Sequence, residues 1–288
     1  MPNRRELGYV SAGSTSTVYV STGNYGRATG GIGSPTAVTI SLVNYEYLTF
    51  NSTGTLTVTT AGWFDYLAVG GGSGNGYYIA GANAGAGGGS GCLQIGSVYL
   101  DANQTITIGG GSATAQWTTV HTASNTSIAA TSPFTQTIGG NVSDGDSSGI
   151  GRIAVGGGMG SIAAQTSIVY TSAYGRNGGN STASTNAGGG GGQSAVGGNG
   201  TSTTGGAGGA GFDVSVFIGG SALFKAMGGG GGGTVTGGTA ATGGVAGSTT
   251  TTPSNGNANS GGGGGGGVGI TTTGNGGSGI CYIRWSVA

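Results

Sequence analysis

Hydrophobic and polar residues alternate along several short stretches of the chain, and this alternation predicts β-strands. Thr55-Leu56-Thr57-Val58-Thr59 and Thr105-Ile106-Thr107-Ile108 alternate at period two between Gly or Asn turns, as half-buried strands do. The apolar run Trp63–Val69 follows the first stretch after Ala61-Gly62, which predicts a hairpin between the two. Helical periodicity with capping residues is found nowhere. We therefore expect an all-β fold of short antiparallel strands in a sandwich-like arrangement.

The pattern changes twice along the chain, which predicts three regions. Residues 1–45 hold isolated alternating stretches and are interpreted as an N-terminal attachment segment. Residues 46–155 form a strand-rich module. In residues 156–288, runs of glycine are interrupted by short apolar segments, which we interpret as strands, among them Phe212–Ile218 and the closing Ile280–Val287.

Glycine changes the picture more than any other residue type. It supplies 75 of the 288 residues, far above the ordinary share of about 7%, with runs at 188–192, 228–233 and 261–267. Such runs are flexible linkers if they stay unordered. Alternatively they form extended, polyglycine II-like helices, in which backbones without side chains pack closely. Collagen is excluded because its strict Gly-X-Y period is not sustained.

Charge and cysteine content narrow the classes of function. Seven Lys and Arg balance seven Asp and Glu, and isolated basic residues do not predict nucleic-acid binding, which depends on neutralising phosphates. No run reaches the roughly 20 apolar residues of a membrane span. The first residues lack the apolar core of a secretory signal, so we expect assembly in a cytoplasm. Cys92 and Cys281 are too few for a disulfide framework or zinc site, and whether they pair is left open.

Residues that could carry catalysis or hold a cofactor are scarce. His121 is the single histidine, and the carboxylates are spread along the chain without a pair suited to acid–base chemistry. We expect no enzyme, cofactor or metal. The stretch 208–216 nearly fits a calcium-binding nonapeptide repeat, but only one copy is present, so Asp213 is interpreted as a turn residue. The stretch 141–149 is rich in oxygen ligands and is interpreted as a polar loop.

Several aromatic residues are better candidates for a binding role. They lie in polar surroundings rich in glycine or serine, where rings can stack on sugars or anchor a protein partner. The alternative is that each covers the end of a strand core. Trp63 and Trp285 lie within strand patterns and are assigned to the core. The candidate receptor-binding residues are Tyr77, Tyr78, Trp117, His121, Tyr170 and Tyr174.

Three ordered motifs resemble a known family. The stretch 53–62, continuing through Tyr66-Leu67-Ala68-Val69-Gly70-Gly71-Gly72, is similar to the opening of the glycine-rich domains of bacteriophage virion and tail-fibre proteins. A second motif is 85–93 followed by 105–111, and the third is the ending 276–285. Order and spacing agree from about Phe50 to Trp285, but not over the first 45 residues.

The resemblance implies a role in a phage appendage. It also resembles tail-fibre adhesins in which packed glycine-rich helices carry loops that touch the host surface, and this favours packed helices over linkers. We expect a virion structural protein, a fibre or tail-tip component that forms a homo-oligomer, with a trimer as the first guess. Its expected partners are other virion proteins through residues 1–45, and a glycan or outer-membrane protein of the host. A capsid decoration protein without a receptor and a self-assembling filament or matrix protein are the alternatives.

Overall fold

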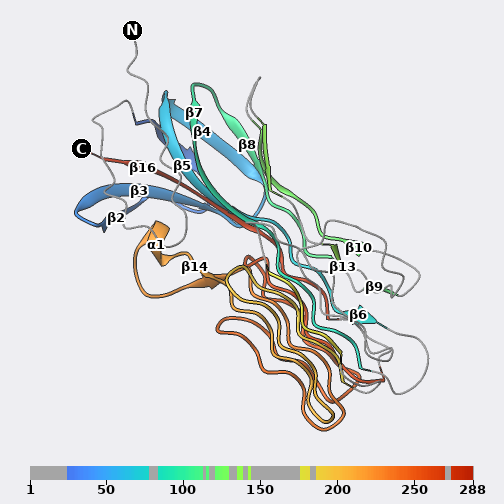
Figure 1. Cartoon of the computed structure of the whole chain (residues 1–288). Coiled ribbons are helices and arrows are strands. Elements are labelled where there is room, and N and C mark those ends of the chain that lie inside the picture. The colour runs from blue at the N-terminus through green and yellow to red at the C-terminus, as the bar shows by residue number, and fades with distance from the viewer. Residues whose placement is uncertain are drawn as a thin grey trace.

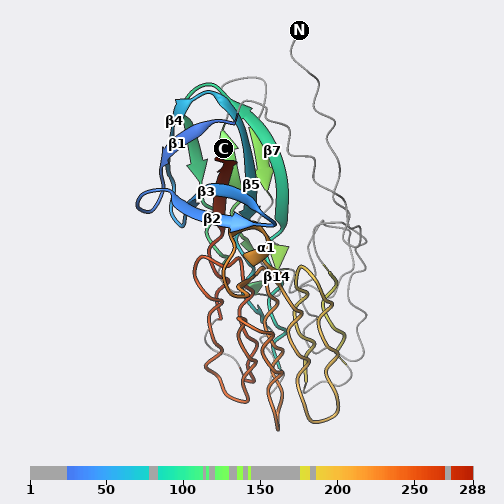
Figure 2. The same cartoon turned by 90° about the vertical axis from the view of Figure 1, so that its left-hand side faces the viewer.

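A β-sandwich forms one end of the molecule and a bundle of extended, glycine-rich segments forms the other (Figures 1 and 2). The computed structural model describes residues 25–77, 84–112, 115–116, 121–129, 135–138, 142–143, 176–181, 186–269 and 274–287. The expected all-β class is confirmed, since the strands pair almost throughout in antiparallel sheets. The one helix in these described ranges, α1 (Ser215–Ile218), is far too short to cross a membrane.

The sandwich consists of two five-stranded antiparallel sheets. The first, sheet A, has the order β2 (Thr36–Ile40), β3 (Val43–Phe50), β16 (Ile280–Ser286), β5 (Gly62–Val69) and β7 (Leu93–Leu100). The second, sheet B, has the order β1 (Arg27–Gly30), β4 (Gly54–Thr60), β8 (Gln104–Thr107), β11 (Thr126–Ala129) and β12 (Thr135–Ile138). The strand nearest the C-terminus thus lies at the centre of sheet A.

The core between the sheets follows the period-two pattern of the strands. Phe64, Tyr66 and Ala68 of β5 face Leu56 of β4 and Ile106 of β8 across the sandwich, and all five are buried. Trp285 of β16 packs edge-to-face on Phe64 at a centroid distance of 5.7 Å. The assignment of Trp285 to the core is confirmed by its exposed fraction of 1%. The same assignment of Trp63 is wrong, because Trp63 lies on the outer face of sheet A, partly buried and outside both core clusters of the sandwich.

The hairpin expected between residues 55–59 and 63–69 is wrong. β4 pairs with β1 and β8, whereas β5 pairs with β16 and β7, so the link at Ala61 carries the chain from one sheet to the other. The physical reason is that both strands carry an apolar row. Facing sheets bury the two rows against each other, whereas neighbours in one sheet would leave them side by side.

The segment 212–225 covers part of the outer face of sheet A. It contains β14 (Phe212–Asp213), α1 and β15 (Phe224–Lys225), so the strand expected over 212–218 is wrong beyond Asp213. Val214, Phe217 and Ile218 pack on the outward residues of sheet A. A helical turn brings these neighbours to one side, whereas a strand would point alternate residues into solvent.

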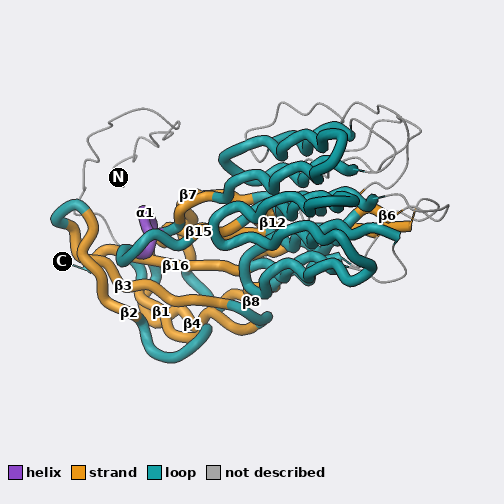
Figure 3. Tube along the Cα trace, turned by 90° about the horizontal axis from the view of Figure 1, so that it is seen from below, coloured by secondary structure: helices purple, strands orange, loops and turns teal. Residues whose placement is uncertain are grey.

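The glycine-rich bundle continues the strands of the sandwich. β5 leads into residues 70–75, residues 84–92 lead back into β7, and residues 274–279 lead into β16. Further extended segments run beside these (Figure 3). Five of the segments have every residue buried, namely 70–75, 84–91, 186–192, 226–233 and 261–267. The glycine runs of the described residues are therefore packed elements and not linkers.

The run 228–233 shows how the segments hold one another. All six N–H groups donate to backbone carbonyls at N···O distances of 2.8–3.3 Å, and successive residues donate to three different neighbouring segments. Residues 228 and 231 donate to Gly209 and Gly206, residues 229 and 232 to Gly88 and Gly85, and residues 230 and 233 to Val245 and Ser248. Three further segments donate back, through Gly190, Gly238 and Gly266. A repeat of three residues is that of an extended threefold helix; the polyglycine II-like backbone geometry itself stays a prediction.

Glycine is needed in these runs because the backbones touch. A Cβ on Gly229 would lie 2.0 Å from the carbonyl oxygen of Gly264, and one on Gly228 would lie 2.0 Å from that of Gly190. Neither glycine has a positive φ. Close approach, and not an unusual backbone conformation, is therefore what excludes side chains here.

The boundary expected at residue 45 falls inside β3, and β1 and β2 belong to the two sheets of the sandwich. The described part of 1–45 thus shares the sandwich with residues up to Ser286. The boundary expected at residue 155 lies outside the described residues, and the attachment role of 1–45 stays a prediction.

Candidate functional site

Three turns lie together at the end of the bundle opposite the sandwich (Figure 2). They comprise residues 201–204, 234–236 and 249–252, which we call the far tip. Every residue of the far tip except Val235 is Ser or Thr. Nearly all are exposed, including Val235 with an exposed fraction of 68%. The far tip thus presents hydroxyl groups around one apolar side chain, without any charge.

Backbone bonds tie the first two turns of the far tip to each other. The N–H groups of Val235 and Thr236 both donate to the carbonyl of Thr203 at 3.2 Å. The N–H of Thr234 donates to Oδ1 of Asn186 at 2.8 Å. The buried run 226–233 leads directly into the second turn, so this turn is held on a framework that its own side chains do not build.

Hydroxyl groups along the third turn are linked in a row. The Oγ atoms of Ser248 and Thr250 lie 2.9 Å apart, and the Oγ1 atoms of Thr250 and Thr252 lie 3.0 Å apart. Hydroxyls both donate and accept hydrogen bonds, so this row can form hydrogen bonds with the hydroxyl groups of a ligand. Sequence reasoning missed these residues because it searched for rings; their signal was a Ser/Thr cluster between two glycine segments.

Two of the six candidate aromatic residues lie within the described ranges. Tyr77 is in β6 (Gly76–Tyr77), which pairs in parallel with β9 (Ala115–Gln116). His121 is in β10 (His121–Thr122), which pairs with β13 (Val142–Ser143). These strands lie along one flank of the bundle (Figure 1). Tyr78, Trp117, Tyr170 and Tyr174 lie outside the described residues, so the grouping of the six stays a prediction.

β6 begins beside the start of the bundle segment 274–279. The N–H of Asn75, just before β6, donates to the carbonyl of Gly274 at 2.8 Å. Gly274 is the first residue of the described segment 274–279, which runs from the end of the bundle opposite the sandwich to β16. Tyr77 therefore leaves the bundle at the end that carries the far tip.

Asp213 acts as the turn residue that the sequence suggested. Its Oδ1 accepts the N–H groups of Leu223 at 2.9 Å and Ser215 at 3.0 Å. These two bonds, with that to Leu223 the larger, hold the pKa of the carboxyl below its usual range. Over the part of the chain that the structure describes, no group of three or more His, Cys, Asp or Glu is placed to hold a metal ion.

The lysine amine and the two cysteine thiols are partly or fully buried, and their environment indicates a structural role. Nζ of Lys225, the single lysine, donates to the carbonyl of Asn259 at 2.8 Å, and burial lowers its pKa. Cys92 and Cys281 are both free thiols, and burial raises the pKa of Cys92 to about 11. A thiol with so high a pKa is a poor nucleophile at neutral pH.

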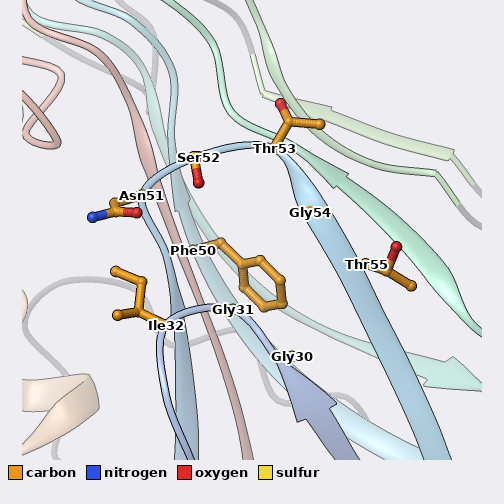
Figure 4. Close-up of a pocket in the computed structure, with 9 residues that line it drawn as sticks. All are labelled: Gly30, Gly31, Ile32, Phe50, Asn51, Ser52, Thr53, Gly54 and Thr55. Atoms are coloured by element: carbon orange, nitrogen blue, oxygen red, sulfur yellow. The ribbon is translucent and has the colours of Figure 1, made fainter.

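A shallow pocket lies on the flank of the sandwich, where the connection after β1 passes the turn after β3 (Figure 4). Its volume is about 270 Å³, and Phe50 and Ile32 supply its apolar wall. Drug-sized ligands occupy about 300–1,000 Å³, and no charged side chain lines this pocket. The far tip is the stronger candidate because its groups are exposed and converge from three separate turns.

The family comparison agrees with this architecture. Residues 49–286 match the family described as a glycine-rich domain. The chain belongs to this family. The match runs from the end of β3 to the last residue of β16, so it takes in most of the sandwich and the whole bundle. No curated protein matches the chain.

Proposed function

We propose that this glycine-rich protein is a structural component of a bacteriophage virion, in a fibre or tail tip, and that its far tip binds the host surface. The observation that carries the proposal is that the two ends of the molecule differ in structure. The first and last described residues, 25 and 287, both lie in the sandwich at one end of the molecule. The bundle carries a cluster of exposed turns at the other end. Such a shape suits attachment through the sandwich and recognition through the turns. The resemblance to phage glycine-rich domains supplies the virion context.

The chemistry of the far tip favours a glycan as the ligand. Exposed hydroxyls with little apolar surface and no charge match the hydrogen-bonding groups of a sugar. The candidate rings, from Tyr77 and Tyr78 to Trp117, His121, Tyr170 and Tyr174, would add stacking surfaces. Binding would not need catalysis, in keeping with the scarcity of acid–base groups. Residues 1–45 would contact other virion proteins.

Host adsorption of the purified protein tests this proposal. Fluorescently labelled wild-type protein should bind host cells, and a variant with Thr249, Thr250, Thr251 and Thr252 all changed to Ala should lose most of that binding. Replacement of Trp117 by Ala tests the aromatic contribution in the same assay. Leu42→Gly, at the opposite end of the molecule, is the matched control and should bind as wild type.

Mass spectrometry of purified particles tests the virion assignment separately. Presence in the particle without adsorption would favour the alternative of a capsid decoration protein, in which changes at the far tip would alter only particle stability. Absence from the particle would contradict both roles.

A further inference from the structure

The outer edge of β7 is the most open strand edge of the described structure. In sheet A, β7 is the last strand, and its neighbour is β5. It is eight residues long and pairs with β5 at every position from Leu93 to Leu100 without a register shift. The edge is therefore long and regular, and it presents a row of backbone groups that a further strand could pair with.

β7 lacks the features with which proteins protect such edges. Its sequence, LQIGSVYL, contains no charged residue and no proline, and no bulge interrupts it. The other edges differ: β1 has a register shift beside Arg27, β2 has five residues and lies against α1, and β12 has four. Short strands, charges and bulges discourage pairing between molecules, so β7 stands apart.

The side chains next to this edge are apolar and half exposed. Ile95 has an exposed fraction of 47% and Tyr99 of 49%. Both lie on the outer face of sheet A, since their partners on β5 are Leu67 and Trp63. Trp63 packs edge-to-face on Tyr99 at 5.8 Å, so the ring of Tyr99 is supported from within the sheet. Aromatic residues held in this way are typical anchors of interfaces.

We propose that two copies of this chain pair through their β7 strands, in antiparallel orientation, and join two five-stranded sheets into one continuous sheet. The second copy is the partner that fits because the strand is self-complementary. A neutral strand meets its own copy without opposing like charges, and the chain as a whole carries no net charge. This proposal does not depend on the function proposed above.

The register of the pair follows from the side chains. Apolar rows stay on one face only if the residue numbers of opposed pairs add to an even sum. If the two-fold axis passes through Ser97, Ile95 of each copy lies opposite Tyr99 of the other copy. The two Ser97 residues then lie opposite each other. Aromatic and β-branched residues directly opposite each other are favourable cross-strand pairs. The proposed two-fold contact departs from the trimer expected from the sequence.

Sedimentation velocity on the full chain tests the contact. The 27.0 kDa chain should sediment as a dimer at high concentration and dissociate on dilution. Ile95→Lys should weaken the association at least about ten-fold, because it places a charge against an apolar ring in the interface. Val235→Lys, which changes an exposed apolar residue of the far tip, is the control and should associate as wild type. Circular dichroism should show that all variants are folded.

A second substitution tests the register. Ile95→Lys combined with Tyr99→Glu places opposite charges across the interface, so association should recover relative to Ile95→Lys alone. The two positions are about 13 Å apart along one strand, so the rescue would not arise within one chain. Ser97→Cys should form a disulfide-linked dimer on mild oxidation, whereas the wild type, with its two native cysteines, should not.

A wild-type protein that stays monomeric at every concentration, or that sediments as a trimer, would overturn the proposal. So would a dimer that Ile95→Lys leaves unchanged. A wild-type protein that dimerises but does not adsorb to host cells would count against the far tip alone, so the two proposals fail separately.

Discussion

Single glycines of the bundle differ sharply in how much space surrounds them. A Cβ on Gly111 would lie 2.0 Å from the carbonyl oxygen of Gly276, whereas one on the adjacent Gly110 would meet no atom within 4 Å. Neither residue has a positive φ. The pair therefore separates the effect of close packing from that of backbone flexibility.

We expect Gly111→Ala to destabilise the protein by about 3 kcal/mol or more, since overpacking against a backbone atom leaves no side chain that can move aside. Gly110→Ala should be neutral or stabilise by about 0.5 kcal/mol, because alanine lowers the entropy of the unfolded chain. Urea unfolding measures both. Equal effects of the two substitutions would contradict the role of close contact.

The turn between β2 and β3 contains two residues other than glycine with positive φ. Ser41 has φ 49° and Leu42 has φ 67°, the positive values that a two-residue type I′ turn requires. Leu42 is 97% exposed, so its side chain gains little from burial. Neither residue is one that this turn favours.

Leu42→Gly should therefore stabilise the protein by about 1 kcal/mol, since glycine adopts a positive φ without the steric cost that leucine bears. The midpoint of urea unfolding should rise while the slope stays the same. The same substitution at Val235, which is not among the residues with positive φ, is the control and should bring no gain. A lowered midpoint for Leu42→Gly would show that the leucine makes contacts that favour the fold.

At the scale of elements, the segment 212–225 joins the bundle to the sandwich. The guanidinium of Arg284 in β16 lies between the rings of Phe217 and Tyr45, at 4.0 and 4.5 Å, and its Nη1 donates to the carbonyl of Phe217. Asp213 closes the same segment by accepting the two N–H groups described above. Arg284 thus fixes the segment to the sandwich, while Asp213 closes the segment on itself.

The bonds of Asp213 predict a dependence on pH. Because folding lowers the pKa of this carboxyl, its contribution to stability is complete above the ordinary value of about 4 and is lost as the pH falls through the folded value. Asp213→Ala should lower the free energy of unfolding at pH 7, and the difference from wild type should shrink as the solution is made strongly acidic. Urea unfolding at several pH values checks this. Asp101, an exposed carboxylate in the turn after β7, is the matched control, and a pH-independent difference for Asp213→Ala would contradict the prediction.

At the scale of the whole molecule, the bundle is stabilised mainly by backbone hydrogen bonds, and its apolar cluster is small, consisting of Ala84, Ala86 and Ala187 with Val268. Burial of 228–233 from all sides, with every N–H bonded, makes these glycines as inaccessible as the core strands. We expect their amides to exchange as slowly as those of β5 and β16, because opening the bundle would leave many buried groups unpaired.

Hydrogen exchange followed by mass spectrometry tests this directly. Peptides covering 226–233 should be protected for as long as peptides from the sandwich, while peptides from 249–252 should exchange early. Exchange of 226–233 at the rate of the exposed turn would mean that the runs behave as linkers in solution.

Much of the fold could be predicted from particular residues. The alternation at 55–59 and 105–108 identified β4 and β8, and Trp285 was rightly assigned to the core. The link at Ala61 was not predictable, since a short connection between two apolar rows fits either a hairpin or a crossing between sheets. The expected strand at 212–218 failed because a short apolar run does not distinguish a strand from a helical turn.

The candidate site was predicted only in part. Tyr77 and His121 were singled out as rings in polar surroundings, and both lie in short strands beside the bundle. The threonines of 249–252 were overlooked because Ser and Thr clusters are common in loops, so a cluster between two glycine segments is only a weak signal. Only their convergence with the turns at 201–204 and 234–236 makes them a surface.

By itself, the sequence determined that this protein is built from β-strands and closely packed backbone. Period-two alternation leaves few options other than strands, and the placement of the glycine runs indicated contact between backbones. Only the tertiary structure decided which segments meet, so that Gly88 bonds to Gly264 and three distant turns form one tip. The physical reason is that successive glycines have no side chains to distinguish one neighbour from another. Their partners are instead set by the strands of the sandwich that anchor each segment and by the turns that reverse it.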